Sequence, residues 1–214
     1  MNHQIHRLRP RRQGAIPNVI FALLIANGLV FAAQQMTFIP QLGIDRITVY
    51  FGLWPATRPD SPFALWQLLT YGFLHGDVVH IAFNMFALWM FGRELELLMG
   101  PKRFLTYFLT CIVGAGVVQL IVAHFQGGLY PTIGASGGVF GILLAFGMAF
   151  PNRMIVLIFP PIPMKAKYFV LFYGLLELYL GVSGSAPGVA NFAHLGGMLF
   201  GFMLLQYWNR TRRR

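Results

Sequence analysis

Six long apolar stretches constrain the fold of this chain more than any other feature. A helix needs about 20 mainly apolar residues to cross the hydrocarbon core of a membrane, and most of the stretches approach that length. Only 10% of the residues are charged, against about 25% in soluble domains, which is too few to cover a soluble surface. We therefore predict an all-α polytopic membrane protein, a six-transmembrane-helix bundle with spans at 16–36, 76–95, 103–125, 136–150, 168–182 and 190–208.

The basic residues predict the orientation of these spans. All but two of the 16 lysines and arginines lie in the two terminal tails, in the connection between spans two and three, and in that between spans four and five. With six spans these four segments share one side of the membrane, and only Arg46 and Arg58 lie on the other. The positive-inside rule places the basic side in the cytoplasm. We expect a multi-pass protein of a cell (inner or plasma) membrane with both termini cytoplasmic: a basic N-terminal tail (1–15), a membrane domain (16–208) and a basic C-terminal tail (209–214).

The same distribution accounts for the formal net charge of +10 without a nucleic-acid partner. Basic segments beside membrane spans bind anionic lipid, so the expected partner is the lipid bilayer and not nucleic acid. A single cysteine, Cys111, excludes an internal disulfide framework and a multi-cysteine zinc site. No metal-binding His-Glu-x-x-His spacing occurs either, and we expect no metal and no cofactor.

The connection from 37 to 75 is long and unusually aromatic for a loop. Tryptophan and tyrosine favour the boundary between lipid and water. We therefore expect this connection to be a structured segment that lies at the outer membrane interface.

The fourth span is too short to cross the bilayer. Residues 136–150 make a helix of about 22 Å, whereas the hydrocarbon core is about 30 Å thick. The preceding residues, 126–135, contain three glycines and a proline, which favour irregular backbone. Such backbone is tolerated at membrane depth only inside protein or beside water. The sequence therefore predicts a short central helix and a water-filled cavity that opens outward, with Ser136 at its floor.

Two polar side chains, Ser136 and His194, are expected at nearly the same depth in the membrane. Ser136 begins the fourth span, where free N–H groups and the positive end of the helix dipole can stabilise an anion. On the sixth span, His194 shares one helical face with Gly197 and Gly201, and Gly137 begins a GxxxG spacing on the fourth span. A close contact between these helices would bring the imidazole to the hydroxyl. The alternatives are an N-cap serine and a hydrogen-bonded packing histidine.

The second span adds two hydrogen-bond donors, His80 and Asn84, at i and i+4 on one face. Both can donate to a developing negative charge. The alternative is that they join helices to one another, a common use of these residues in membranes.

A soluble-hydrolase reading of the same serine fails. Residues 134–138 fit the G-x-S-x-G motif, and Ser136, Glu177 and His194 follow the hydrolase order. That motif requires a strand before the serine, whereas this sequence has a Gly/Pro-rich loop. We expect Glu177 to accept hydrogen bonds between helices or to be protonated rather than to orient His194, so the predicted site is a Ser-His dyad in which no buried carboxylate orients the histidine.

Three blocks of this sequence resemble the rhomboid intramembrane serine proteases: His80-x-x-x-Asn84, Gly134-Ala-Ser136-Gly137-Gly-x-x-Gly, and Ala-His194-x-x-Gly197-x-x-x-Gly201. They occur in the family's order on spans two, four and six. The resemblance implies a protease that cuts transmembrane protein substrates near their outer ends. It assigns Ser136 as nucleophile, His194 as base, and His80, Asn84 and the Ser136 backbone N–H as the oxyanion hole.

Some positions depart from that family or match only its structural features. Gln67 stands where the family often has arginine, and Phe140 where it often has a tyrosine stacked beneath the histidine. Phe140 can still stack. Residues expected to be structural are Gly92, Glu96, His75, Cys111 and His124.

Two alternatives to a protease remain from the sequence. The first is a catalytically weak rhomboid-like protein that binds or escorts membrane proteins, although such proteins would lack the serine or the histidine. The second is a transporter, because polar residues in a membrane cavity can pass protons or solutes. No inverted repeat supports that reading.

Overall fold

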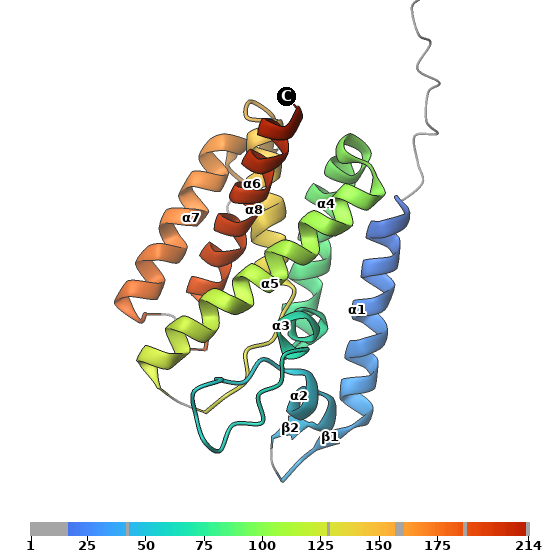
Figure 1. Cartoon of the computed structure of the whole chain (residues 1–214). Helices are drawn as coiled ribbons and strands as arrows, with labels where there is room; N and C mark the ends of the chain where they lie inside the picture. Colours follow the sequence, from blue (N-terminus) through green and yellow to red (C-terminus); the bar gives the residue numbers. More distant parts are fainter. Residues whose placement is uncertain (1–16, 42, 128, 157–160, 186–187, 213–214) are drawn as a thin grey trace, which may run out of the picture.

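Six long helices form the body of the protein (Figure 1). The computed structural model describes residues 17–41, 43–127, 129–156, 161–185 and 188–212. The long helices are α1 (Asn18–Met36), α4 (Val78–Met99), α5 (Pro101–Gln126), α6 (Ser136–Ala149), α7 (Ala166–Ser183) and α8 (Asn191–Arg212). Each overlaps one predicted span, and the all-α bundle is confirmed.

The largest differences lie at the C-terminal ends of α4 and α8, which run about one turn beyond the predicted spans. Part of the predicted C-terminal tail is therefore helical, up to Arg212. The predicted N-terminal tail and residues 213–214 lie outside the described residues. The start of α1 and the end of α8 lie at the same end of the bundle (Figure 1).

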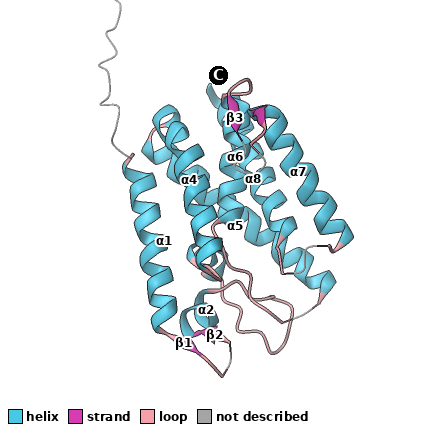
Figure 2. Cartoon of the chain, turned by 180° about the vertical axis from the view of Figure 1, so that it is seen from behind, coloured by secondary structure: helices cyan, strands magenta, loops and turns pink. Residues whose placement is uncertain are grey.

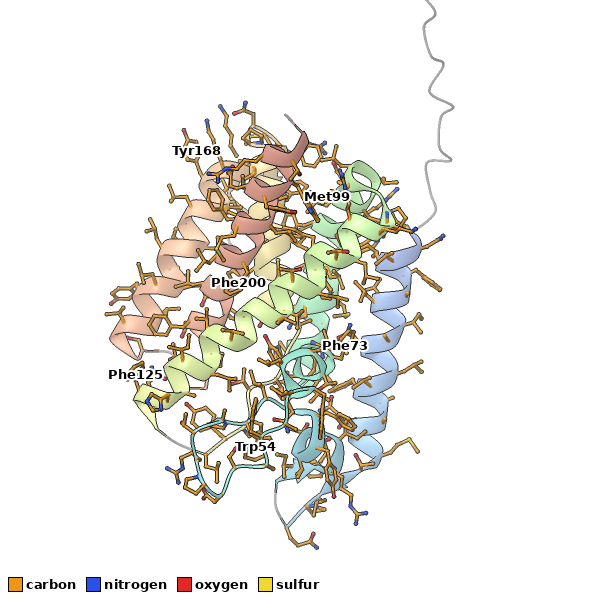
Figure 3. All side chains as sticks on the ribbon, viewed as in Figure 1. Trp54, Phe73, Met99, Phe125, Tyr168 and Phe200 are labelled. Carbon is orange, nitrogen blue, oxygen red and sulfur yellow. The ribbon has the colours of Figure 1, made fainter. Side chains whose placement is uncertain are left out.

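Several of the long helices are apolar enough to cross a membrane. Helices α1, α5 and α7 each have the length and hydropathy to cross a bilayer alone, and α4 does so together with the short helices before it, from which it bends by 97°. Their outer faces carry apolar side chains such as Phe125 and Tyr168 (Figure 3). Helix α6 is apolar but only 14 residues long, or about 21 Å.

Helix α6 occupies the centre of the bundle, packed against α4, α5, α7 and α8 (Figure 2). Its glycines make this possible. A Cβ at Gly138 would collide with the Phe108 ring of α5, and one at Gly141 with Cys111. A Cβ at Gly197 of α8 would overlap the carbonyl of Gly137. The expected close contact between the fourth and sixth spans is therefore present.

The connection between α1 and α4 is structured, as predicted. It contains β1 (Phe38–Ile39), β2 (Ile44–Asp45), α2 (Arg46–Phe51), α3 (Gln67–Thr70) and the 3-10 helix η1 (Tyr71–Phe73). Strands β1 and β2 pair antiparallel. The buried Gln34 amide of α1 joins Asp45, Thr48 and the His75 backbone. Trp54 lies in this segment (Figure 3), whose place at the membrane interface stays a prediction.

The opposite end of the bundle is closed by polar contacts. The buried Glu96 carboxylate accepts hydrogen bonds from the backbone N–H groups of Val19 and Ile20, 3.1 and 2.9 Å long, and so caps α1. Glu94 forms a two-point ion pair with Arg153. Strands β3 (Met154–Val156) and β4 (Pro163–Lys165) pair antiparallel between α6 and α7.

Candidate active site

The chain before α6 fixes Ser136 at the start of a buried helix. Leu53 and Thr132 exchange two backbone hydrogen bonds, and the Gly134 N–H donates to the Tyr71 carbonyl. Gly134 has a φ of +128°, a conformation that favours glycine. The first N–H groups of α6 have no partners within the helix, so Ser136 lies beside free donors.

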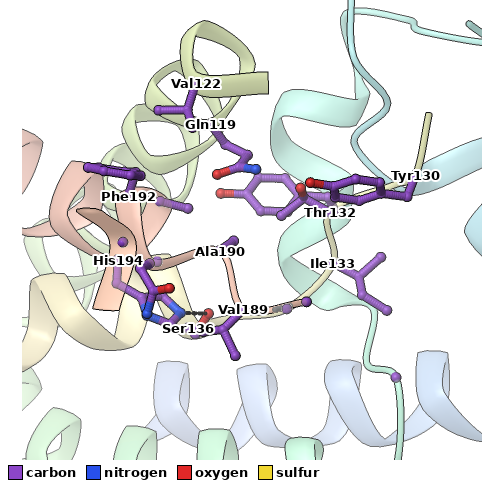
Figure 4. Close-up of a pocket in the computed structure, with 18 of the residues that line it drawn as sticks. Gln119, Val122, Tyr130, Thr132, Ile133, Ser136, Val189, Ala190, Phe192 and His194 are labelled. Atoms are coloured by element: carbon purple, nitrogen blue, oxygen red, sulfur yellow. Dashed lines mark hydrogen bonds between the residues drawn. The ribbon is translucent and has the colours of Figure 1, made fainter. Parts of the chain in front are cut away.

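His194 lies in the first turn of α8, against Ser136. Its Nε2 is 2.8 Å from the Ser136 Oγ (Figure 4), and only 8% of the residue is exposed. The Phe140 ring stacks on the imidazole, with centroids 4.3 Å apart and planes 6° from parallel. Phe140 thus makes the expected stack without a hydroxyl. The close approach of Gly137 and Gly197 places the two helices at this distance.

A cavity of about 650 Å³ opens beside this pair. Its walls come from α4, α5, the connection before α6, the end of α7 and the start of α8. Figure 4 shows Gln119 and Tyr130 at the wall opposite His194. The side chains of Ser136, His194, His80 and Asn84 all line this one cavity, so the structure brings all four predicted site residues together.

His80 presents a donor to the cavity. Its Nδ1 accepts the Gly76 N–H at 3.3 Å, which leaves the proton of a neutral imidazole on Nε2. A Cβ on Gly134 would stand 2.9 Å from this Nε2, so the glycine makes room for the ring. Asn84 donates one amide hydrogen to the His80 carbonyl and keeps the second available.

Glu177 accepts a hydrogen bond between helices, as expected, but it also lies beside the histidine, which disagrees with a dyad that has no carboxylate near its base. Glu177 Oε2 of α7 is 2.9 Å from His194 Nδ1 and accepts the Asn191 amide at 2.6 Å. Although this distance is short, the N–H bond at His194 Nδ1 does not point at the oxygen well enough to form a hydrogen bond of good geometry. This contact was not predictable from the sequence, because it depends on how α7 packs against α8. Sequence reasoning also missed Asn191, which shares a helical face with His194 at i and i+3.

Other residues singled out by the sequence lie around the site rather than in it. Gln67 accepts the Trp54 N–H and donates to the carbonyls of Tyr50 and Pro62. It therefore organises the connection around itself without an arginine.

The other two histidines that the structure describes, and the cysteine, lie outside the cavity. His75 is buried edge-on against the His80 ring, and His124 is exposed near the end of α5. Cys111 is buried at the contact with Gly141. Gly92 packs against Ile20, and together with the Glu96 cap this confirms the structural roles expected there.

The fold and this site define a class: an all-α, multi-pass membrane protein with a serine–histidine pair in a polar cavity at the start of a short central helix. Residues 62–210 match the family described as the rhomboid domain. That match covers more than half of the chain, and the chain belongs to the rhomboid family.

Several similar proteins support this family assignment. Rhomboid protein 1, mitochondrial, of Saccharomyces cerevisiae is 27% identical over 199 residues, which cover 91% of this chain and 54% of that protein. Rhomboid protease GluP of Bacillus subtilis is 34% identical over 143 residues, 64% of this chain and 25% of that protein. The rat presenilin-associated rhomboid-like protein, mitochondrial, is 28% identical over 192 residues, 88% and 48% respectively. The chain spans about half the length of these relatives or less.

Proposed function

We propose that this protein is an intramembrane serine endopeptidase, with Ser136 as nucleophile and His194 as general base. The observation that carries the proposal is the 2.8 Å contact between Ser136 Oγ and His194 Nε2 at the N-terminus of a buried helix. A hydroxyl is a weak nucleophile until a neighbouring base takes its proton. This pair supplies both groups within hydrogen-bond reach.

The reaction is acyl transfer. His194 Nε2 takes the Ser136 proton as Oγ attacks the scissile carbonyl, and the protonated imidazole then gives that proton to the leaving amine. The acyl-enzyme is hydrolysed by a water molecule that His194 deprotonates in the same way. The polar cavity beside the pair is the route for that water.

The negative charge that develops on the carbonyl oxygen needs donors. The Ser136 N–H belongs to the unpaired first turn of α6, and the helix dipole favours an anion there. His80 Nε2–H and the second Asn84 amide hydrogen line the same cavity. We assign these three groups to the oxyanion hole.

The substrates we propose are transmembrane segments of other membrane proteins, cut near their outer ends. A helix keeps its carbonyls in hydrogen bonds, so the segment must unwind before Ser136 can attack. Glycine, proline or polar residues near the cut lower the cost of unwinding. A cavity of about 650 Å³ has room for a short extended strand and not for a second intact helix.

The test is cleavage of a designed transmembrane substrate in liposomes. Ser136→Ala and His194→Ala should each abolish turnover and labelling by a fluorophosphonate probe. Ser185→Ala should behave as wild type, because this serine is exposed and its hydrogen bonds within the described residues are to Ser183. Undiminished cleavage by Ser136→Ala would refute the proposal. A wild-type protein that captures the substrate without cutting it would favour the escort function instead.

We further propose that both termini face the cytoplasm and that the cavity opens on the other side. In the described part of the chain, the basic connections α4–α5 and α6–α7 lie at the end of the bundle where α1 begins and α8 ends (Figure 1), and basic segments favour the cytoplasmic side. A membrane-impermeant thiol reagent tests this in a Cys111→Ala background. Ser185→Cys should react in intact cells, and Asn152→Cys only after the membrane is opened. The reverse pattern would show an inverted protein and the opposite side of product release.

A further inference from the structure

A carboxylate inside an apolar helix makes contact with the proposed base. Glu177 lies in the middle of α7 and is 7% exposed, among residues that are otherwise largely apolar. An ionisable side chain at membrane depth is costly and marks function or a specific partner. The partners of Glu177 are His194 Nδ1 at 2.9 Å and the Asn191 amide at 2.6 Å.

The histidine is therefore held on three sides. Ser136 Oγ lies at Nε2, Glu177 Oε2 lies at Nδ1, and the Phe140 ring covers one face. A neutral imidazole that accepts the serine proton at Nε2 must carry its own proton on Nδ1. An ionised carboxylate can only accept hydrogen bonds, so Glu177 favours that tautomer.

We propose that Glu177 is a positioning residue for His194, with Asn191 holding its carboxylate in place. This inference rests on the proposed function, because it describes how the same base is oriented and charged. The Nδ1–H is not well aligned with Oε2 in the present structure. Hydrogen bonds in catalytic groups are often poorly aligned without substrate and tighten in the complex. Glu177 then stabilises the imidazolium that forms during attack.

The competing explanation is structural: Glu177 and Asn191 would only tie α7 to α8. The Glu177→Gln substitution separates the two explanations, because glutamine keeps the volume and can still accept the Asn191 hydrogen bond but carries no charge. A purely structural tie predicts no change in the pH profile. Among the described residues, the other ionisable side chains that line the cavity with His194 include His80 on α4 and Asp77 just before that helix, and they are unchanged in this variant.

The measurement is kcat, KM and the pH profile of kcat/KM for the transmembrane substrate. Glu177→Gln should lower kcat about 10–100-fold with little change in KM. It should also move the acidic limb of the pH profile lower by about one pH unit or more, because the loss of a neighbouring negative charge weakens proton binding by about 1–3 pH units. Glu177→Asp, which keeps the charge, should return the limb to its wild-type position. Glu94→Gln, which breaks only the exposed pair with Arg153, is the matched control.

Two kinetic results overturn the proposal: wild-type kcat and pH profile in Glu177→Gln, or the same limb shift in Glu177→Asp as in Glu177→Gln. A second measurement needs no variant at position 177. Nitrogen NMR of ¹⁵N-histidine-labelled wild-type protein, with His194 assigned by comparison with His194→Ala, should show the Nδ1–H tautomer. An Nε2–H tautomer overturns the proposal. This result decides the role of Glu177 even if wild-type protein fails to cleave, which would refute the protease function alone.

Discussion

The close approach of α6 and α8 makes a quantitative prediction for Gly197→Ala. The added Cβ would overlap the Gly137 carbonyl oxygen, whereas a carbon atom and a carbonyl oxygen in weak contact stand about 3.3–3.6 Å apart. The two helices must therefore part by roughly 1.5 Å. Overpacking of this kind costs about 1–3 kcal/mol, and here the obstacle is backbone, which has no rotamer to change.

The same displacement acts on the site, because Ser136 precedes Gly137 and His194 lies one turn before Gly197. Parting the helices by roughly 1.5 Å would lengthen the contact of 2.8 Å between Oγ and Nε2 beyond hydrogen-bond range, and a misplacement of only about 1 Å can cost about 10²-fold in rate. Gly197→Ala should therefore lose about 10²-fold in the rate of fluorophosphonate labelling and in turnover, with a lower thermal unfolding midpoint in detergent.

Two glycines serve as controls for this prediction. Gly28 on α1 has nothing within 4 Å of its Cβ position. Gly28→Ala should therefore raise the free energy of unfolding by about 0.5–1 kcal/mol through helix propensity, and the fluorophosphonate probe should label this variant at the wild-type rate. Gly174→Ala on α7 would meet only the flexible end of Met198, at 3.4 Å, and should also label normally. Wild-type labelling and stability in Gly197→Ala would refute the argument that backbone contact between α6 and α8 sets the Ser136–His194 distance.

Two further predictions use polar groups. Asn84→Ala should keep partial activity, with a loss smaller than the 10²–10³-fold typical of one oxyanion donor, because His80 and the Ser136 N–H remain; complete loss in a stably folded protein would contradict shared donors. Glu96→Gln should lower the free energy of unfolding by about 1–3 kcal/mol, since two backbone donors of α1 lose a charged acceptor, whereas Glu94→Gln breaks only an exposed pair worth about 0–1 kcal/mol. Equal unfolding midpoints for these two variants would show that the α1 cap does not contribute.

The helices were predictable because hydropathy and length act locally. A span must be apolar along its whole length, so each long helix is visible in the sequence as a long apolar run. The contact between α6 and α8 was predictable for a related reason: glycines at i and i+4, as at Gly137 and Gly141, are typical of helices that approach closely. The C-terminal ends of α4 and α8 were not predictable from hydropathy, because both helices continue past the apolar run into polar residues such as Glu96 and Arg210.

The contact of Glu177 with His194 illustrates what the sequence does not contain. The spacing of polar and apolar residues in α7 does not indicate which face of that helix packs against α8, because most of its residues are apolar. The one available signal was the cost of a carboxylate in a membrane span, which requires a partner without naming it. Gln67 is similar: its three partners come from a folded connection whose path depends on distant residues.

The irregular backbone before α6 bears on how the proposed hydrolysis at membrane depth is compatible with a stable fold. Unpaired N–H and C=O groups would be costly there. In this protein Thr132 pairs with Leu53, and Gly134 donates to Tyr71. The cavity wall therefore has much of its backbone already hydrogen-bonded. The polar groups that line the cavity are mainly side chains, among them Ser136, His194, His80, Asn84 and Gln119. A short α6 is thus a requirement of the proposed chemistry: a helix long enough to span the bilayer would place Ser136 at the surface, and its N-terminal donors would lose their strength to bulk water.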